Sequence, residues 1–215
     1  RGLHAGDMKY LDLDGNNKIE QTVSANDIKD QRIIGNSLPR YTYSIRLNAE
    51  WNGIDFSVFF QGVGKQDWYP SSDAFAFWGP YSSPAPSFIP KDFLADVWSV
   101  DNPDAYFPRP RGYIAWTDGR SLSSVNNRYL QSLAYCRLKN LTVGYTLPVK
   151  WLSKIHVQKA RLYFSGENLL TLDRLDTDYI DPEAAAAGTN WKTGKTNALS
   201  YPFSKTYSFG IDITF

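Results

Sequence analysis

The last eleven residues of this 215-residue chain, Lys205 to Phe215, alternate between apolar and polar side chains. Successive side chains of a β-strand point to opposite faces, so this segment predicts a strand with one apolar and one polar face. The aromatic Phe215 at its end is typical of outer-membrane β-barrels, in which the last strand is an assembly signal. Soluble β-sandwiches also end on amphipathic strands, so this segment leaves both folds open.

Four further segments have strand character, over residues 41–51, 54–63, 133–146 and 157–170. Asn52-Gly53 separates the first two and predicts a two-residue type I′ turn, because both of its positions need positive φ. Most of the five segments have ten or more residues, about twice the mean length of a globular strand. This length matches the roughly 9–11 residues of a tilted transmembrane strand.

The connections between these segments alternate between short and long. They contain two residues at 52–53, about 69 at 64–132, about ten at 147–156 and about 34 at 171–204. Short periplasmic turns and long extracellular loops characterise outer-membrane barrels. We therefore predict an all-β fold, namely strands of a large antiparallel transmembrane barrel. Because five strands cannot close a barrel, the remaining strands are expected to precede Arg1, in a longer protein.

The predicted organisation follows the chain in order. Residues 1–40 form an extracellular loop, 41–63 a barrel hairpin, 64–132 a long extracellular loop, 133–170 two strands with a periplasmic turn, 171–204 an extracellular loop, and 205–215 the terminal strand. The residues expected to face lipid are Phe56, Val58, Leu162, Phe164, Phe209 and Ile211. Those expected to face the lumen are Arg46, Asp55, Arg161 and Asp212.

The third strand departs from this alternation. If Leu141, Val143 and Tyr145 face lipid, Arg137 and Lys139 share their face. One interpretation places both cations at the outer end of the strand, at the level of lipopolysaccharide phosphates, where a charge costs little. The other is a β-bulge that shifts the alternation by one residue. Both interpretations are open at this point.

Composition excludes several classes of protein. With 23 Lys+Arg against 22 Asp+Glu, the chain has no charge excess that would favour nucleic-acid binding. No apolar run approaches the roughly 20 residues of a transmembrane helix. The single Cys136 permits no internal disulfide, and His4 and His156 lack the neighbours of a catalytic triad or zinc site. We therefore expect that the chain is not an enzyme.

Four stretches in order carry a family resemblance. They are residues 6–19 followed by 34–39, residues 138–148, residues 165–171 leading to Asp181-Pro-Glu183, and the terminal Phe215. Across essentially its whole length the chain resembles the C-terminal region of SusC/RagA-type TonB-dependent transporters of Bacteroidetes. The resemblance implies a 22-stranded barrel with an N-terminal plug, in the outer membrane of a Gram-negative bacterium.

The same resemblance implies partners and a substrate class. A SusD-type surface lipoprotein would act as a lid, TonB would supply energy through the missing N-terminal part, and the barrel would lie among outer-membrane lipid and lipopolysaccharide. The imported substrate would be an oligosaccharide or a peptide. A passive porin or structural barrel is the main alternative, and a soluble calcium-binding β-domain is another.

A candidate cation site lies near the start of the chain. Asp12, Asp14 and Asn16 occupy positions 1, 3 and 5 of a calcium-loop pattern, and the backbone carbonyl of Lys18 occupies position 7. Oxygen ligands at these positions suit a hard cation, so we predict a structural Ca²⁺ or Mg²⁺ ion. An Asx-rich turn without metal is the alternative.

Two positions of this loop depart from the calcium pattern. Asn17 replaces the usual glycine, although asparagine also tolerates positive φ. Val23 stands where the loop usually has a bidentate glutamate, so the closing carboxylate must come from elsewhere. The family resemblance indicates Asp30, with Asp27 as the competitor.

The long connection 64–132 is rich in tryptophan and holds eight of the 12 prolines. Trp68, Trp78 and Trp116 are candidates to face the lid lipoprotein or the substrate, because aromatic side chains often anchor interfaces and stack on sugars. Trp98 is expected to belong to a short helix over residues 90–98. The alternative is that the aromatic side chains pack the loop on itself.

Overall fold

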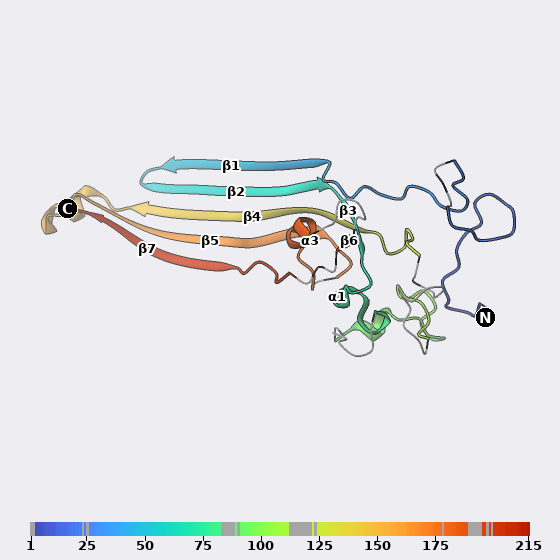
Figure 1. Ribbon diagram of the computed structural model, residues 1–215. Helices are drawn as coiled ribbons and strands as arrows, with labels where there is room; N and C mark the ends of the chain where they lie inside the picture. Colours follow the sequence, from blue (N-terminus) through green and yellow to red (C-terminus); the bar gives the residue numbers. More distant parts are fainter. Residues whose placement is uncertain are drawn as a thin grey trace.

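The computed structural model describes residues 3–22, 24, 26–82, 89, 91–111, 122, 124–177, 179–188, 195–196, 198 and 200–215. Five long strands form one antiparallel sheet (Figure 1). In spatial order they are β1 (Tyr41–Trp51), β2 (Ile54–Lys65), β4 (Gln131–Thr146), β5 (Lys159–Arg174) and β7 (Thr206–Thr214). The five predicted strands are confirmed, and β2, β4 and β5 extend further towards the loops than expected.

The connections segregate to the two ends of the sheet. Figure 1 shows the N-terminal segment and both long loops at one end, and the two short turns and the C-terminus at the other. Asn52 has φ 50° and Gly53 has φ 85°, which confirms the predicted turn with two positive φ values. The other turn contains a short helix, α2 (Val149–Leu152), and a 3₁₀ turn, η3 (Ser153–Ile155).

Short elements join the two long loops. Strand β3 (Asp67–Pro70) pairs antiparallel with the start of β4 and parallel with β6 (Lys195–Thr196). The remaining helical turns are α1 (Phe75–Trp78), η1 (Gly79–Tyr81), η2 (Phe93–Asp96) and α3 (Pro182–Gly188). In the parts of the chain described above, no helix is long and apolar enough to cross a membrane.

The helix expected over residues 90–98 is wrong in extent. Over the described residues 91–98 the only helical element is the 3₁₀ turn η2, and Val97 already has an extended backbone with φ −98° and ψ 132°. The Trp98 N–H donates to the Phe107 carbonyl at 3.1 Å. The Val97 N–H still donates to the Leu94 carbonyl at 3.3 Å, so the helical hydrogen bonding ends at Val97, and Trp98 pairs with the segment around Phe107 instead.

The main buried cluster lies at the loop end of the sheet. Most of its side chains come from the 64–132 connection, and Ile180, Ala185 and Ala198 join it from the 171–204 loop. Met8 of the N-terminal segment packs against this cluster. Three segments distant in sequence therefore share one apolar core, which gives the loop end an ordered structure of its own.

Candidate functional site

The strand registers sort the side chains of the sheet into two faces. One cross-strand row contains Ala49, Phe56, Val143, Phe164 and Phe209. The neighbouring row contains Asn48, Ser57, Thr142, Ser165 and Ser208. Because adjacent rows point to opposite sides, one face is apolar and the other polar.

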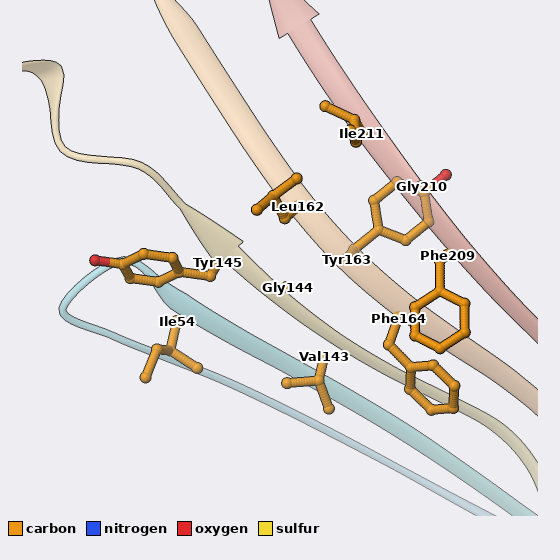
Figure 2. Close-up of a pocket in the computed structure, with 10 residues that line it drawn as sticks. All are labelled: Ile54, Val143, Gly144, Tyr145, Leu162, Tyr163, Phe164, Phe209, Gly210 and Ile211. Carbon is orange, nitrogen blue, oxygen red and sulfur yellow. The ribbon is translucent and has the colours of Figure 1, made fainter. Parts of the chain in front are cut away.

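The apolar face forms a shallow open groove over β2, β4, β5 and β7 (Figure 2). Figure 2 shows Val143, Leu162, Phe164, Phe209 and Ile211 gathered there. Phe209 and Ile211 are 83% and 63% exposed. All six residues expected to face lipid share this face, and Arg46, Asp55, Arg161 and Asp212 share the other. The predicted alternation is therefore confirmed.

An ion-pair cluster lies on the polar face at the turn end of the sheet. Arg161 donates to both carboxylate oxygens of Asp55, at 2.8 and 2.5 Å, and to Asp212 at 3.2 Å. A Cβ at Gly144 would overlap both Asp55 and Arg161, so glycine provides the space for their close contact. The sequence placed the three charged residues on one face but did not reveal that they pair.

A β-bulge in β4 determines on which face of the sheet Arg137 lies. Phe59 pairs with Asn140 and Phe60 with Leu138, which leaves Lys139 as an extra residue. The bulge shifts the alternation by one position, so Arg137 pairs with Gln61 on the polar face. The bulge interpretation is confirmed, and the placement of these cations beside lipopolysaccharide is wrong.

Arg137 lies at the centre of a second charged cluster, at the loop end. Its side chain is only 2% exposed and forms ion pairs with Asp181 and, at 2.7 Å, with Glu183. Its Nε donates to the Thr171 hydroxyl at 2.9 Å, and Lys139 reaches Glu183 at 3.0 Å. In the sequence, Asp181-Pro-Glu183 stands out only as part of the family resemblance, and no local pattern predicts that it pairs with Arg137.

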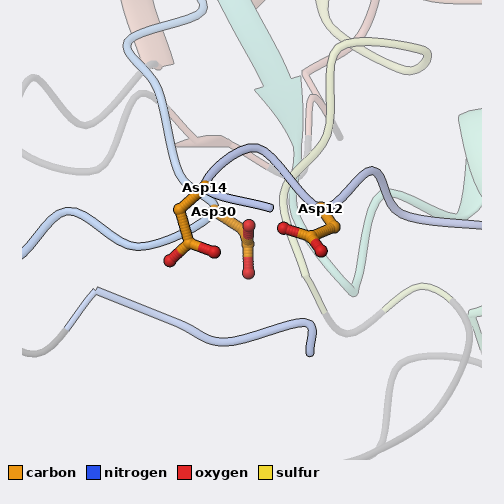
Figure 3. A group of neighbouring side chains, drawn as sticks. All are labelled: Asp12, Asp14 and Asp30. Carbon is orange, nitrogen blue, oxygen red and sulfur yellow. The ribbon is translucent and has the colours of Figure 1, made fainter. Parts of the chain in front are cut away.

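Three of the predicted cation ligands come together at the N-terminal segment. Carboxylate oxygens of Asp12, Asp14 and Asp30 lie within 4.8 Å of one another (Figure 3). Asp27 instead pairs with Lys29 at 3.3 Å, so Asp30 is the carboxylate that joins the group. Asn17 has φ 62°, which agrees with its expected position in the turn.

The remaining ligand positions fit less directly. The Asn16 side chain turns its amide nitrogen to Asp14 at 3.1 Å, while its oxygen accepts from the Lys18 N–H at 2.8 Å. The amide would have to rotate to present oxygen to a cation. Val23, at the position of the usual glutamate, lies outside the described residues.

The electrostatics of the Asp12, Asp14 and Asp30 cluster suit a hard cation. Backbone N–H groups of Glu20 and Leu13 donate to Asp30, each at 2.7 Å, and hold the pKa of Asp30 below its usual range. Asp12 likewise accepts the N–H groups of Gly15 and Asn17. Three adjacent negative charges repel, and a divalent ion would relieve this repulsion. The same backbone contacts would also satisfy a metal-free Asx turn, so the ion stays a prediction.

The structure corrects the role expected for two tryptophans. Trp68 and Trp78 are 0% exposed, so neither side chain offers surface to a partner or substrate. Trp78 packs against Phe77 and Tyr129 with ring centroids 4.7 and 5.0 Å apart. Its Nε1 donates to the Ser71 carbonyl at 3.0 Å. For these two residues the alternative, packing of the loop on itself, is confirmed.

Trp116 and Phe215 are the remaining aromatic residues with a predicted role. Trp116 lies outside the described residues. Phe215 follows the end of β7 and is 80% exposed, and its role as an assembly signal stays a prediction.

The N-terminal segment is attached to the 64–132 loop through residues that shortly precede Asp12 of the aspartate cluster. Asp7 forms an ion pair with Arg111, and the Tyr10 hydroxyl donates to the Ser124 carbonyl at 3.2 Å. Gly6, with φ 82°, lies so close to the Trp98 ring that a Cβ would overlap it. The predicted cation site therefore adjoins the ordered loop end of the sheet.

The curated proteins similar to this chain include three that are named TonB-dependent receptors. No protein-family model matches the chain. TonB-dependent receptor P3 of Formosa agariphila is 32% identical over 216 residues, covering 98% of this chain and 19% of the relative. TonB-dependent receptor P26 of the same organism is 27% identical over 213 residues, covering 98% and 20%. The chain thus spans about a fifth of the length of these relatives.

Solved structures show a similar fold. The RagAB peptide importer in its open-open state matches with a TM-score of 0.57 and 24% identity, over 91% of this chain and 19% of that chain. The RagAB peptide transporter matches with a TM-score of 0.58 and 24% identity, over 86% and 18%. These names describe receptors and importers, which fits the expectation of a non-enzyme. The sequence similarity and the shared fold show that this chain belongs to the TonB-dependent receptors and forms part of their antiparallel β-barrel.

Proposed function

We propose that this chain forms part of the wall of an outer-membrane importer, with its apolar face towards lipid and its polar face towards the channel. The observation that carries the proposal is the separation of the two faces across all five long strands. Exposed apolar side chains cover one face, and serine, threonine, asparagine and paired charges cover the other. This is the arrangement that a water-filled barrel in a membrane requires.

Cysteine labelling of the full-length receptor tests the assignment of the faces. After Cys136 is replaced by serine, we expect S57C and S165C to react with a water-soluble maleimide. F56C and F209C are expected to react with a lipid-soluble reagent. The reverse pattern would contradict the assignment.

We infer that the whole receptor imports oligosaccharides or peptides with energy from TonB. The names of the relatives support the coupling to TonB, and the RagAB structures support a peptide as substrate. Deleting the TonB-contacting segment of the full-length receptor is expected to abolish uptake of labelled oligopeptides or oligosaccharides, while the barrel remains in the outer membrane. Undiminished uptake would indicate a passive porin instead.

A SusD-type surface lipoprotein is the proposed partner at the loop end. Leu94 and Val100 are 78% and 83% exposed there, and the buried aromatic cluster gives their loop an ordered base. Apolar side chains that form a contiguous exposed patch mark interfaces, so these two residues are the ones to test. Deleting the loop would remove its own core, so point substitutions are the sharper test.

We expect the double variant L94D/V100D of the full-length receptor to bind the lipoprotein at least about tenfold more weakly in co-purification. D101R, an exposed change in the same loop, serves as the matched control and should retain binding. Equal recovery with both variants would show that these side chains do not form the interface.

A further inference from the structure

Helix α3 of the 171–204 loop folds back over the polar face of the sheet. Figure 1 shows α3 in front of β4 and β5. Its anchor Arg137 pairs in register with Gln61, and Gln61 lies on the same side of β2 as Asp55. The described part of this helix therefore lies on the side that we assign to the channel.

The Arg137–Asp181 pair that attaches α3 is buried, and both carboxylate oxygens of Asp181 accept hydrogen bonds. One Asp181 oxygen accepts the N–H groups of Glu183 and Ala184, at 3.0 and 3.1 Å, and so caps the helix. The other oxygen pairs with Arg137. Glu183 pairs with both Arg137 and Lys139. Removal of one partner from the buried Arg137–Asp181 pair leaves an unpaired buried charge, which strongly favours detachment of α3.

The returning limb of the loop meets the same two cations. The Phe203 ring lies 4.9 Å from the Arg137 guanidinium carbon and 4.7 Å from Lys139 Nζ. Strand β6 also pairs with β3 of the other long loop. Both limbs are thus held at one point of the wall.

The charges of this attachment cancel, because two cations face two carboxylates. The helix adds only alanine and glycine after Glu183. An element of this kind obstructs a channel by its volume and contributes no net charge. It would discriminate between substrates by width and not by charge.

We propose that Arg137 is a positioning residue that holds residues 180–186 across the outer part of the channel and thereby limits the width of the substrate that enters. The proposal rests on the proposed function, in which the polar face lines the channel. The neutral constriction favours narrow, extended substrates over branched ones.

The test measures access to the channel wall in the full-length receptor in intact cells. Ser165 lies on the polar face, further from the loop end than Thr171 on the same strand. The reporter S165C, with Cys136 replaced by serine, is treated with a small maleimide or a bulky polyethylene-glycol maleimide. In R137M we expect the bulky reagent to react about tenfold faster, with little change for the small one.

R161M is the matched control, because Arg161 also lies on the polar face and pairs with two carboxylates, Asp55 and Asp212. It lies at the turn end, and its rate with the bulky reagent should equal that of the parent. Heat-modifiable migration in gels reports whether each barrel is folded. The loop-side variant D181N/E183Q leaves the strands unchanged and should reproduce R137M if the latter fails to fold.

The outcomes separate this inference from the proposed function. If the small reagent reacts with S165C while the bulky reagent reacts equally in all folded variants, the constriction is refuted and the channel assignment stands. If only a lipid-soluble reagent reacts with S165C, the channel assignment itself fails. A selective gain with the bulky reagent in R137M or D181N/E183Q supports the constriction.

Discussion

Replacing Trp78 with alanine is expected to lower the free energy of local unfolding of the 64–132 loop by about 3–5 kcal/mol. The side chain is fully buried, packs against Phe77 and Tyr129, and donates a hydrogen bond to Ser71. Its removal leaves a large cavity in a cluster that three chain segments share. Hydrogen exchange of the loop amides in the full-length receptor measures the local free energy.

The exposed Leu94 of the same loop supplies the control. L94A should change the local free energy by no more than about 0.5 kcal/mol, because the side chain is 78% exposed. The β4 and β5 amides should remain protected in both variants. Unchanged exchange in W78A would mean that the aromatic cluster does not hold the loop together.

Calcium or magnesium at about a hundred times its dissociation constant is expected to stabilise the N-terminal segment by about 2.7 kcal/mol. The cation would bind among Asp12, Asp14 and Asp30 and relieve their mutual repulsion. Hydrogen exchange of the Leu13 and Glu20 amides, both bonded to Asp30, measures this effect. A chelator should reverse it.

D30N should largely remove the response to the cation, whereas the control D27N should retain it, because Asp27 pairs with Lys29 outside the group. Ligand distances of about 2.3–2.6 Å in an experimental structure would identify calcium, and about 2.0–2.1 Å magnesium. If both cations leave the wild-type exchange unchanged, the segment is a metal-free Asx turn.

The five long strands and their two faces followed from local pattern. A period of two over ten or more residues places the apolar side chains on one face and the polar side chains on the other, and the registers observed for Phe56, Phe164 and Phe209 follow it. Asn52-Gly53 specified its turn through the positive φ of both residues. The grouping of Asp12, Asp14 and Asp30 was also expected, in part from the family resemblance.

The Arg137 cluster and the burial of the tryptophans depend on contacts between segments distant in sequence, and the local sequence pattern does not predict such contacts. A one-residue bulge at Lys139 turns Arg137 from the apolar face to the polar face. There the guanidinium pairs with Asp181 and Glu183, which lie more than 40 positions further along the chain. Trp68 and Trp78 look the same in the sequence whether they face a partner or a core. Their burial depends on the apolar residues that three separate segments bring together, because the free energy of removing apolar surface from water is obtained only when those surfaces meet.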